Sequence, residues 1–241
     1  MQKNLINNFE ITPKSLEEIL IDVEKAWEEK QSLRILSFNP EMLIYSTENK
    51  DFDNALRKAQ IIIADGIGII ILLKLMGVKF IKRIAGIDLA SKILEKACEK
   101  NISIALLGGT EDTIKNTIEK IKLKYQNINI IYKRHGFFNQ EQEKNIIKEI
   151  LELQPQLVFL ALPFQRAEII IADLQKQKLH AILMGVGGTF DVWSGGIKRS
   201  PLVFQKLGLE WFWRLCLQPQ RFQRIFKMFV GLLKIILFRY N

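Results

Sequence analysis

An aspartate and two glycines follow directly after a short apolar run. The run Ile61-Ile62-Ile63-Ala64 ends at Asp65-Gly66-Ile67-Gly68, which is typical of a buried strand followed by a tight turn. An Asp in that place lies at the carboxyl edge of a sheet, where open α/β folds bind their ligands. Its carboxylate could take a proton from a substrate hydroxyl. The alternative, which the pattern leaves open, is an aspartate that only caps the apolar helix expected over residues 67–75.

Two glycine-rich turns follow other apolar runs, at residues 108–110 and 185–189. Each could present backbone N–H groups and a helix N-terminus to a phosphate. The alternative is a tight turn that only reverses the chain and binds nothing. The substrate-binding positions that we expect here are Gly108, Gly109, Gly187, Gly188, Phe190 and Asp191. Asp191 could accept hydrogen bonds from ribose hydroxyls, or it could cap a helix.

Stricter motifs are missing from the sequence. Phe190 stands where the dinucleotide-binding fingerprint needs its last glycine, and no Walker A Gly-Lys-Ser/Thr occurs. Nucleotide or phosphate binding is therefore indicated, whereas a nicotinamide-dependent oxidoreductase is disfavoured. The sequence also lacks His-Glu-x-x-His and Gly-x-Ser-x-Gly, which disfavours metalloprotease-like and serine-hydrolase mechanisms. We expect no cofactor and no metal.

A polar loop is expected after the apolar run at residues 128–132. It reads Arg134-His135-Gly136-Phe137-Phe138, and Gly136 and Phe137 are candidate substrate contacts. His135 could touch a substrate, but the pattern favours an ordinary loop histidine.

The positive charge is concentrated at one end of the chain. The formal net charge is +9, and residues 198–241 hold nine Lys or Arg and one acidic residue, Glu210, whereas the remainder holds 26 basic and 25 acidic residues. Such asymmetry points to an anionic partner, which could be nucleic acid, a membrane surface or a phosphorylated substrate. Arginine binds phosphate through two parallel hydrogen bonds. The basic residues that we expect to bind substrate or phosphate are Lys198, Arg199, Arg214, Arg221 and Arg224.

The last part of this segment reads as an amphipathic helix. Residues 228–238 are apolar at nine of eleven positions, too few to cross a bilayer, which takes about 20. At 100° per residue, one sector holds Arg224, Lys227, Gly231 and Lys234, and Phe222, Phe226, Phe229, Leu233 and Ile236 lie mainly outside it. A basic face beside a wide apolar face is typical of a helix in the membrane interface. A helix packed on the protein's own core or on a sister subunit is the alternative.

Strand and helix patterns alternate along the rest of the 241 residues. Strands are expected at 33–38, 61–64, 102–107, 128–132, 157–162 and 180–186, and helices at 41–58, 67–75, 87–100, 110–125, 139–153 and 164–175. This alternation predicts an α/β fold with a mainly parallel, Rossmann-like sheet and helices on both faces. We expect an α/β core over residues 1–197 and a helical, basic appendage over 198–241.

Cysteine usage and the N-terminal residues bear on the compartment. Cys98 and Cys216 are far apart and lack metal-ligand spacing, which suits a reducing compartment. No signal peptide is recognisable. We expect a cytoplasmic protein, associated peripherally with the inner face of the membrane.

Several of these segments, in the same order, resemble the WecG/TagA/CpsF glycosyltransferases. The resemblance rests on the Ala64–Gly68 turn, Arg83–Gly86, Gly185–Asp191, Lys198–Pro201, and Gly208–Trp211 with Arg214, Pro219 and Arg221. It extends from about Ser37 to Arg224, nearly the whole chain.

The resemblance implies a reaction. Members of that family move a sugar, typically N-acetylmannosamine, from a UDP donor to the C4 hydroxyl of N-acetylglucosamine on a polyprenyl diphosphate. The product is a β-linked, inverted disaccharide lipid of cell-wall or surface polysaccharide synthesis, and no metal is needed. Inversion needs one base and an in-line attack.

The resemblance also implies roles for individual residues. Asp65 matches the proposed catalytic base. Ser37 stands where the family pattern has Thr, and Asn39, Arg83 and Gln165 match residues that line the pocket. Arg214, Arg221 and Arg224 match an appendage that completes the site at the membrane and meets the lipid diphosphate. The family's Gly-x-Pro-Lys-Gln-Glu segment is changed here to Leu162-Pro163-Phe164-Gln165-Arg166-Ala167-Glu168.

A basic α/β protein that binds nucleic acid or membrane without transferase activity is the main alternative. It would explain the basic segment but not the Asp65 turn, and contact with phosphates needs spaced charge rather than the aliphatic bulk of residues 228–238. We therefore expect a UDP-sugar, a lipid-linked acceptor and a membrane surface as partners, with a homo-oligomer possible and no nucleic acid.

Overall fold

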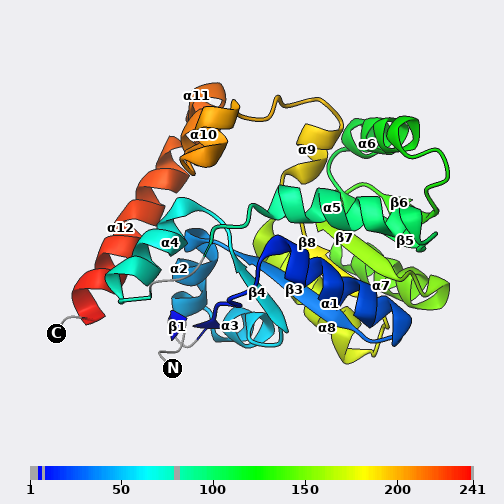
Figure 1. The fold of residues 1–241 in the computed structure, drawn as a ribbon, viewed down its shortest axis with the longest axis horizontal. Coiled ribbons are helices and arrows are strands. Elements are labelled where there is room, and N and C mark those ends of the chain that lie inside the picture. Colours follow the sequence, from blue (N-terminus) through cyan, green and yellow to red (C-terminus); the bar gives the residue numbers. More distant parts are fainter. Residues whose placement is uncertain (1–4, 7–8, 79–81, 240–241) are drawn as a thin grey trace.

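A six-stranded parallel sheet forms the centre of the protein (Figure 1). The structure, a computed structural model, describes residues 5–6, 9–78 and 82–239. The sheet order is β4-β3-β8-β7-β5-β6. Its strands are β3 (Leu33–Phe38), β4 (Ile61–Ala64), β5 (Ile104–Gly108), β6 (Ile130–Arg134), β7 (Leu157–Ala161) and β8 (Ile182–Gly185). A separate antiparallel pair joins β1 (Leu5–Ile6) to β2 (Phe9–Glu10). The predicted parallel α/β fold is confirmed.

Helices cover both faces of this sheet. They are α1 (Leu16–Glu28), α2 (Pro40–Glu48), α3 (Lys50–Leu56), α4 (Ile67–Leu75), α5 (Gly86–Glu99), α6 (Glu111–Lys124), α7 (Gln140–Leu153), α8 (Phe164–Lys176), α9 (Thr189–Trp193), α10 (Leu202–Lys206), α11 (Glu210–Leu217) and α12 (Phe222–Arg239), with a 3₁₀ turn at Pro219–Arg221. Alternate residues of each strand face opposite sides. Ile35 and Phe159 pack with α1, α5 and α6, whereas Leu36 packs with α2 and α3, and Leu160 with α7 and α8.

Local sequence signals explain where several helices begin. Asn139 and Gln142 form the predicted capping box of α7, and the Thr110 hydroxyl accepts a hydrogen bond from the Thr113 N–H at the start of α6. The single helix expected over residues 41–58 is wrong, because the chain forms α2 and α3 there. Asn49 ends α2 and its side chain caps α3 by accepting from the Phe52 N–H.

The strands all end at one edge of the sheet. Their last residues include Phe38, Ala64, Gly108, Ala161 and Gly185. From β5 the chain passes outward to β6, whereas from the neighbouring β7 it passes inward to β8. Such a switch between adjacent strands leaves a crevice outside their carboxyl ends, where α/β folds bind ligands.

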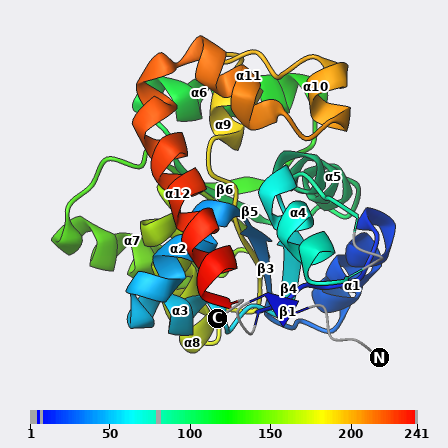
Figure 2. The same cartoon turned by 90° about the vertical axis from the view of Figure 1, so that its left-hand side faces the viewer.

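The C-terminal helices lie against this core (Figure 2). On α12, Leu232 is buried, Met228 and Ile235 pack on the same apolar cluster as α2 and α4, and Gly231 faces the Ile44 side chain closely. The alternative of packing on the protein's own core is therefore correct for one face of α12. Gly231 belongs to that packed face rather than to the basic one.

A second apolar face of α12 is exposed. Its residues are Phe222, Phe226, Phe229, Val230, Leu233 and Leu237. Lys227 and Lys234 are exposed beside it. Among the described residues, no helix combines the length and the apolar character needed to cross a membrane.

Candidate active site

Asp65 lies at the carboxyl end of β4, as the sequence predicts. Its backbone N–H donates to the Phe38 carbonyl (2.9 Å), which continues the pairing of β4 with β3 by one residue. Its Oδ2 atom accepts a hydrogen bond from the Ser37 hydroxyl (2.8 Å) and one from the Gly86 N–H (3.3 Å). No hydrogen bond to Oδ1 occurs within the described part of the chain. Asp65 therefore has one oxygen fixed by the protein and one without a hydrogen bond to the described residues, and it does not cap α4, whose N-cap is Gly66.

The surroundings of Asp65 alter its proton affinity. Burial raises the pKa of Asp65 above the ordinary value for an aspartate. The hydrogen bonds from Ser37 and Gly86 and the positive charge of Arg83 act in the opposite direction, whereas the negative charge of Glu210 raises the pKa further. A carboxylate with a raised pKa is a stronger base, which suits proton abstraction near neutral pH.

Gly86 is required for this arrangement. A Cβ atom at this position would lie 2.5 Å from the Ser37 Oγ and 3.1 Å from Asp65 Oδ2. Any other residue would push apart the two side chains that meet at the end of β3 and β4.

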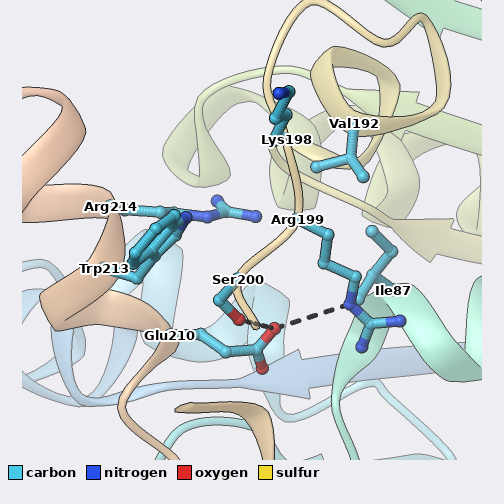
Figure 3. Close-up of a pocket in the computed structure, with 8 residues that line it drawn as sticks. All are labelled: Ile87, Val192, Lys198, Arg199, Ser200, Glu210, Trp213 and Arg214. Atoms are coloured by element: carbon cyan, nitrogen blue, oxygen red, sulfur yellow. Dashed lines mark hydrogen bonds and ion pairs between the residues drawn. The ribbon is translucent and has the colours of Figure 1, made fainter. Parts of the chain in front are cut away.

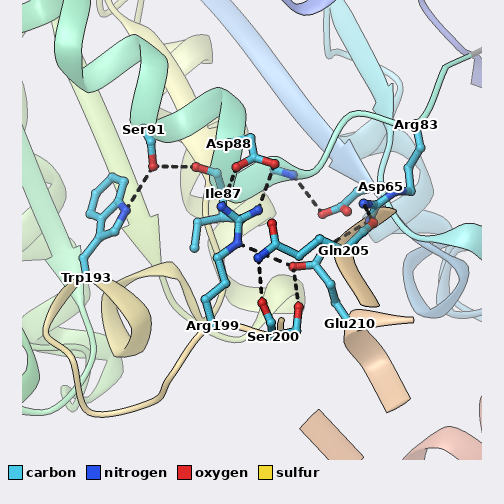
Figure 4. Close-up of polar contacts among 11 residues, drawn as sticks. Asp65, Arg83, Ile87, Asp88, Ser91, Trp193, Arg199, Ser200, Gln205 and Glu210 are labelled. Atoms are coloured by element: carbon cyan, nitrogen blue, oxygen red, sulfur yellow. Dashed lines mark hydrogen bonds and ion pairs between the residues drawn. The ribbon is translucent and has the colours of Figure 1, made fainter. Parts of the chain in front are cut away.

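Arg83 is placed next to Asp65 by the loop that precedes α5. The Ile84 N–H donates to the Ala64 carbonyl (3.2 Å), so this loop runs along the end of β4. The Arg83 guanidinium donates to Glu210 Oε2 (3.1 Å) and to the Gln205 carbonyl (2.6 Å). Figure 4 shows these groups around Asp65.

Asn39 and Gln165 lie at the same edge but are not joined to the Asp65 cluster by a hydrogen bond. The Asn39 side-chain oxygen accepts from the N–H groups of Glu41 (3.0 Å) and Met42 (3.1 Å) and so caps α2. Its amide nitrogen makes no hydrogen bond within the described part of the chain, and a role of Asn39 in the pocket stays a prediction. Gln165 is half-buried in the first turn of α8, beyond the end of β7.

The first glycine-rich turn has a structural requirement of its own. A Cβ atom on Gly108 would collide with the Ala161 backbone, since β5 and β7 approach closely there. The Gly109 N–H donates to Ala161 (3.1 Å), and the Gly136 N–H donates to Gly109 (2.8 Å). Phe137, next to this turn, is 72% exposed. Phosphate binding at Gly108 and Gly109 and substrate contact at Gly136 and Phe137 stay predictions.

The second turn leads into α9. Gly187 adopts a positive φ of 51° and has open space where a side chain would be. Phe190 is 1% exposed and stacks on Trp193 within the core, so its side chain offers no surface to a substrate. Substrate binding at position 190 stays a prediction, which the backbone alone would have to meet. Asp191 is half-buried in the first turn of α9, whose N-cap is Gly188, so Asp191 is not the cap residue.

Basic side chains from the C-terminal segment line a small cavity beside α9 (Figure 3). Lys198, Arg199 and Arg214 line a cavity of about 10 Å³ together with Ile87, Val192, Ser200, Glu210 and Trp213, room for about one water molecule. Arg199 is paired with Asp88 through two contacts of 2.6 and 2.8 Å. Lys198 and Arg214 have no ion pair within the described residues. The side chains of Arg221 and Arg224 lie outside the described part of the structure.

Glu210 and Asp88 are site residues that sequence reasoning missed. Glu210 begins α11 and contacts Arg83, Ser200 (3.4 Å) and Arg199 (3.7 Å). The available signal was its position as the single acidic residue of segment 198–241.

No group of three or more His, Cys, Asp or Glu side chains that could hold a metal ion occurs in the described ranges. Asp51 and Asp53 have the Asp-x-Asp spacing that is found in some metal sites. They lie on α3, where Asp53 pairs with Arg57 (2.7 Å) and Asp51 is exposed.

The parallel sheet with helices on both faces places the chain in the α/β class, and comparison with known proteins shows its family. The model of the glycosyl transferase WecG/TagA/CpsF family matches residues 4–240, and the chain belongs to this family.

Two relatives carry the same descriptive name, N-acetylglucosaminyldiphosphoundecaprenol N-acetyl-beta-D-mannosaminyltransferase. The protein from Bacillus subtilis (strain 168) is 33% identical over 227 residues, which cover 93% of this chain and 88% of the relative. The one from Bacillus spizizenii is 31% identical over 226 residues, which cover 93% and 87%. This chain is thus similar to enzymes of that name over almost its whole length.

Proposed function

We propose that the protein is an inverting glycosyltransferase that moves N-acetylmannosamine from a UDP donor to the C4 hydroxyl of N-acetylglucosamine carried on a polyprenyl diphosphate. Membership of the family and the names of the two relatives support this assignment. The product would serve wall teichoic acid or another surface polysaccharide.

The observation that carries the proposal is the environment of Asp65. One carboxylate oxygen is held by Ser37 and Gly86, and the other makes no hydrogen bond among the described residues. Burial raises the pKa of this carboxyl group, so the ionised form is a stronger base than an exposed aspartate. An acceptor hydroxyl could meet Oδ1 without disturbing the rest of the cluster.

The proposed chemistry is a single displacement. Asp65 Oδ1 takes the proton of the acceptor C4 hydroxyl. The C4 oxygen attacks the anomeric carbon of the donor sugar from the side opposite UDP. The bond between that carbon and the oxygen of the β-phosphate breaks, and its electrons leave on UDP. This displacement needs one base and one stabilised leaving group, and it forms no covalent enzyme intermediate.

The leaving diphosphate requires positive charge or N–H donors. We place UDP at the carboxyl ends of the strands, between Gly108 and the segment Gly187–Asp191. Lys198 and Arg214 line the cavity beside α9 and have no ion pair with the described residues. They supply this charge without a metal, and Arg221 and Arg224 are proposed to meet the diphosphate of the lipid acceptor.

The exposed apolar face of α12 is proposed to rest on the membrane surface. It carries Phe226, Phe229 and Leu233, with Lys227 and Lys234 beside it. Such a helix lies in the interface between headgroups and acyl chains. The acceptor lipid stays in the same membrane, so the protein would act as a cytoplasmic, peripherally bound enzyme.

Transfer can be tested directly. The protein is incubated with a panel of UDP-sugars and a lipid-linked N-acetylglucosamine acceptor, with and without EDTA, and the product is identified by mass. A disaccharide lipid formed from UDP-N-acetylmannosamine in the presence of EDTA is expected. Absence of any product with the panel would contradict the assigned reaction, and a strict metal requirement would contradict the metal-free mechanism.

A further inference from the structure

Glu210 joins the C-terminal segment to the candidate catalytic residues. Its Oε2 atom accepts from Arg83 Nη1 (3.1 Å), and its Oε1 atom accepts from the Ser200 hydroxyl (3.4 Å) and lies 3.7 Å from Arg199 Nε. Arg83 and Glu210 are 127 positions apart in the sequence. Their side chains are only 19% and 20% exposed. The contact is therefore a partly desolvated ion pair rather than a loose surface pair.

Both protein acceptors of Arg83 come from the C-terminal segment. Besides Glu210, the guanidinium donates to the Gln205 carbonyl at 2.6 Å, and the Gln205 side chain in turn donates to the Ser200 carbonyl (2.6 Å). The orientation of Arg83 beside Asp65 therefore depends on α10, α11 and the chain that precedes them (Figure 4).

Each arginine of this cluster has an anionic partner. Arg83 and Arg199 are faced by Glu210 and by Asp88, which holds Arg199 through both of its oxygens. A neutral residue at 210 would leave Arg83 without its anionic partner, close to Asp65. The other groups that face Asp65 are the Ser37 hydroxyl from β3 and the Gly86 N–H from α5.

We propose that Glu210 is a positioning residue for the transfer reaction, which holds the Arg83 guanidinium in place beside Asp65 and ties segment 198–217 to the catalytic edge of the sheet. This inference rests on the proposed function. Glu210 is the single acidic residue of the basic segment. It would act by positioning Arg83 and would not touch the reacting atoms itself.

The inference has two separable consequences. Loss of the Glu210 contact frees Arg83 to move, and misplacement by about 1 Å can cost about 100-fold in rate. Loss of the Glu210 charge also removes an effect that raises the pKa of Asp65. With the Arg83 charge still beside Asp65, the pKa of Asp65 then falls, and the acid limb of the pH profile moves to lower pH, because the base must be ionised to act.

The test compares Glu210→Gln with Glu210→Asp. The Gln variant should lose about 10- to 100-fold in kcat, and the acid limb of kcat/KM should move to lower pH, because the Glu210 charge raises the pKa of Asp65. The Asp variant keeps the charge on a shorter side chain, so it should lose rate while its acid limb stays near that of the wild type. Glu152→Gln, on the exposed end of α7, is the matched control for loss of one carboxylate.

A titration of the Asp65 carboxyl carbon by NMR separates this inference from the proposed function, since it requires no transfer. A lower Asp65 pKa in folded Glu210→Gln supports the inference even if the assigned donor is wrong. An unchanged Asp65 titration together with wild-type kcat would overturn it. So would a loss of rate with an unmoved acid limb, which would mark Glu210 as merely structural.

Discussion

The Ser37 hydroxyl donates a 2.8 Å hydrogen bond to Oδ2 of Asp65, between two neighbouring strands. Ser37 is the fifth residue of β3 and Asp65 is the first residue after β4. The hydrogen bond opposes the effect of burial, because it lowers the pKa of Asp65 whereas burial raises it. The two strands thus fix both the place of the carboxylate and part of its proton affinity.

Removal of this hydroxyl should change the pH dependence of transfer. In Ser37→Ala the pKa of Asp65 rises further, so the acid limb of kcat/KM should move to higher pH. The direction follows because the hydrogen bond from Ser37 stabilises the ionised carboxylate and so lowers its pKa. Ser37→Thr keeps the hydroxyl and should retain the wild-type profile. An unmoved limb in Ser37→Ala would contradict the assigned hydrogen bond.

Asp191 tests the proposed place of the donor. Asp191 does not cap α9, and under the proposed function its carboxylate accepts hydrogen bonds from the ribose hydroxyls. Asp191→Ala should weaken UDP binding, measured by calorimetry, by about tenfold, the equivalent of one charge-assisted hydrogen bond. Asp173→Ala, at an exposed position in the last part of α8, is a control with the same change of charge. Equal UDP affinity of the Asp191 variant and the wild type would contradict the proposed position of the nucleotide.

The exposed face of α12 can be tested without removal of the helix. Truncation after Pro219 would also remove Leu232 from the core, so substitutions are the cleaner test. Phe226→Gln with Leu233→Gln should reduce binding to anionic liposomes by more than about tenfold, since each buried side chain contributes about 1.5–3 kcal/mol. The melting temperature should hardly change. Leu123→Gln, at an 83% exposed position on α6, is the control. Undiminished liposome binding by the double variant would rule out this face as the membrane contact.

A buried ion pair between Arg34 and Glu168 supports the sheet beneath the site. The two side chains are at most 1% exposed and lie 2.7 Å apart, and Arg34 also donates to the Ala55 carbonyl (2.6 Å). Glu168→Ala leaves the Arg34 charge buried without its partner, so the free energy of unfolding should fall by about 3–5 kcal/mol in urea denaturation. Glu152→Ala, which breaks an exposed pair with Lys148, should change it by no more than about 1 kcal/mol. Similar losses in the two variants would contradict the buried pairing.

The fold could be predicted because its signals are local. Apolar runs ended by Asp65 or by glycine mark the strand ends, and Thr110 and Asn139 mark helix starts. The ends of the strands could not be predicted to the residue. A strand is expected from Ile102, which is buried, but β5 begins only at Ile104. The position of Asp65 at the sheet edge followed from the strand pattern alone.

The contacts that cross the chain could not be predicted. Nothing in the spacing of Arg83 and Glu210 indicates that they meet, because only the packing of α10 and α11 on the core brings them together. The buried role of Phe190 depends in the same way on its stacking with Trp193. On α12, helical periodicity separated a basic from an apolar face, but not the apolar face that packs on α2 from the one that remains exposed.

The most direct test of the whole account is the rate of sugar transfer by Asp65→Asn. The substitution keeps the shape of the side chain but cannot accept the acceptor's proton. Turnover to the lipid-linked acceptor should fall by roughly 10²–10⁴-fold, whereas UDP affinity and the melting temperature should stay close to those of the wild type. Turnover within about twofold of the wild type in this variant would remove Asp65 from the mechanism and contradict the account.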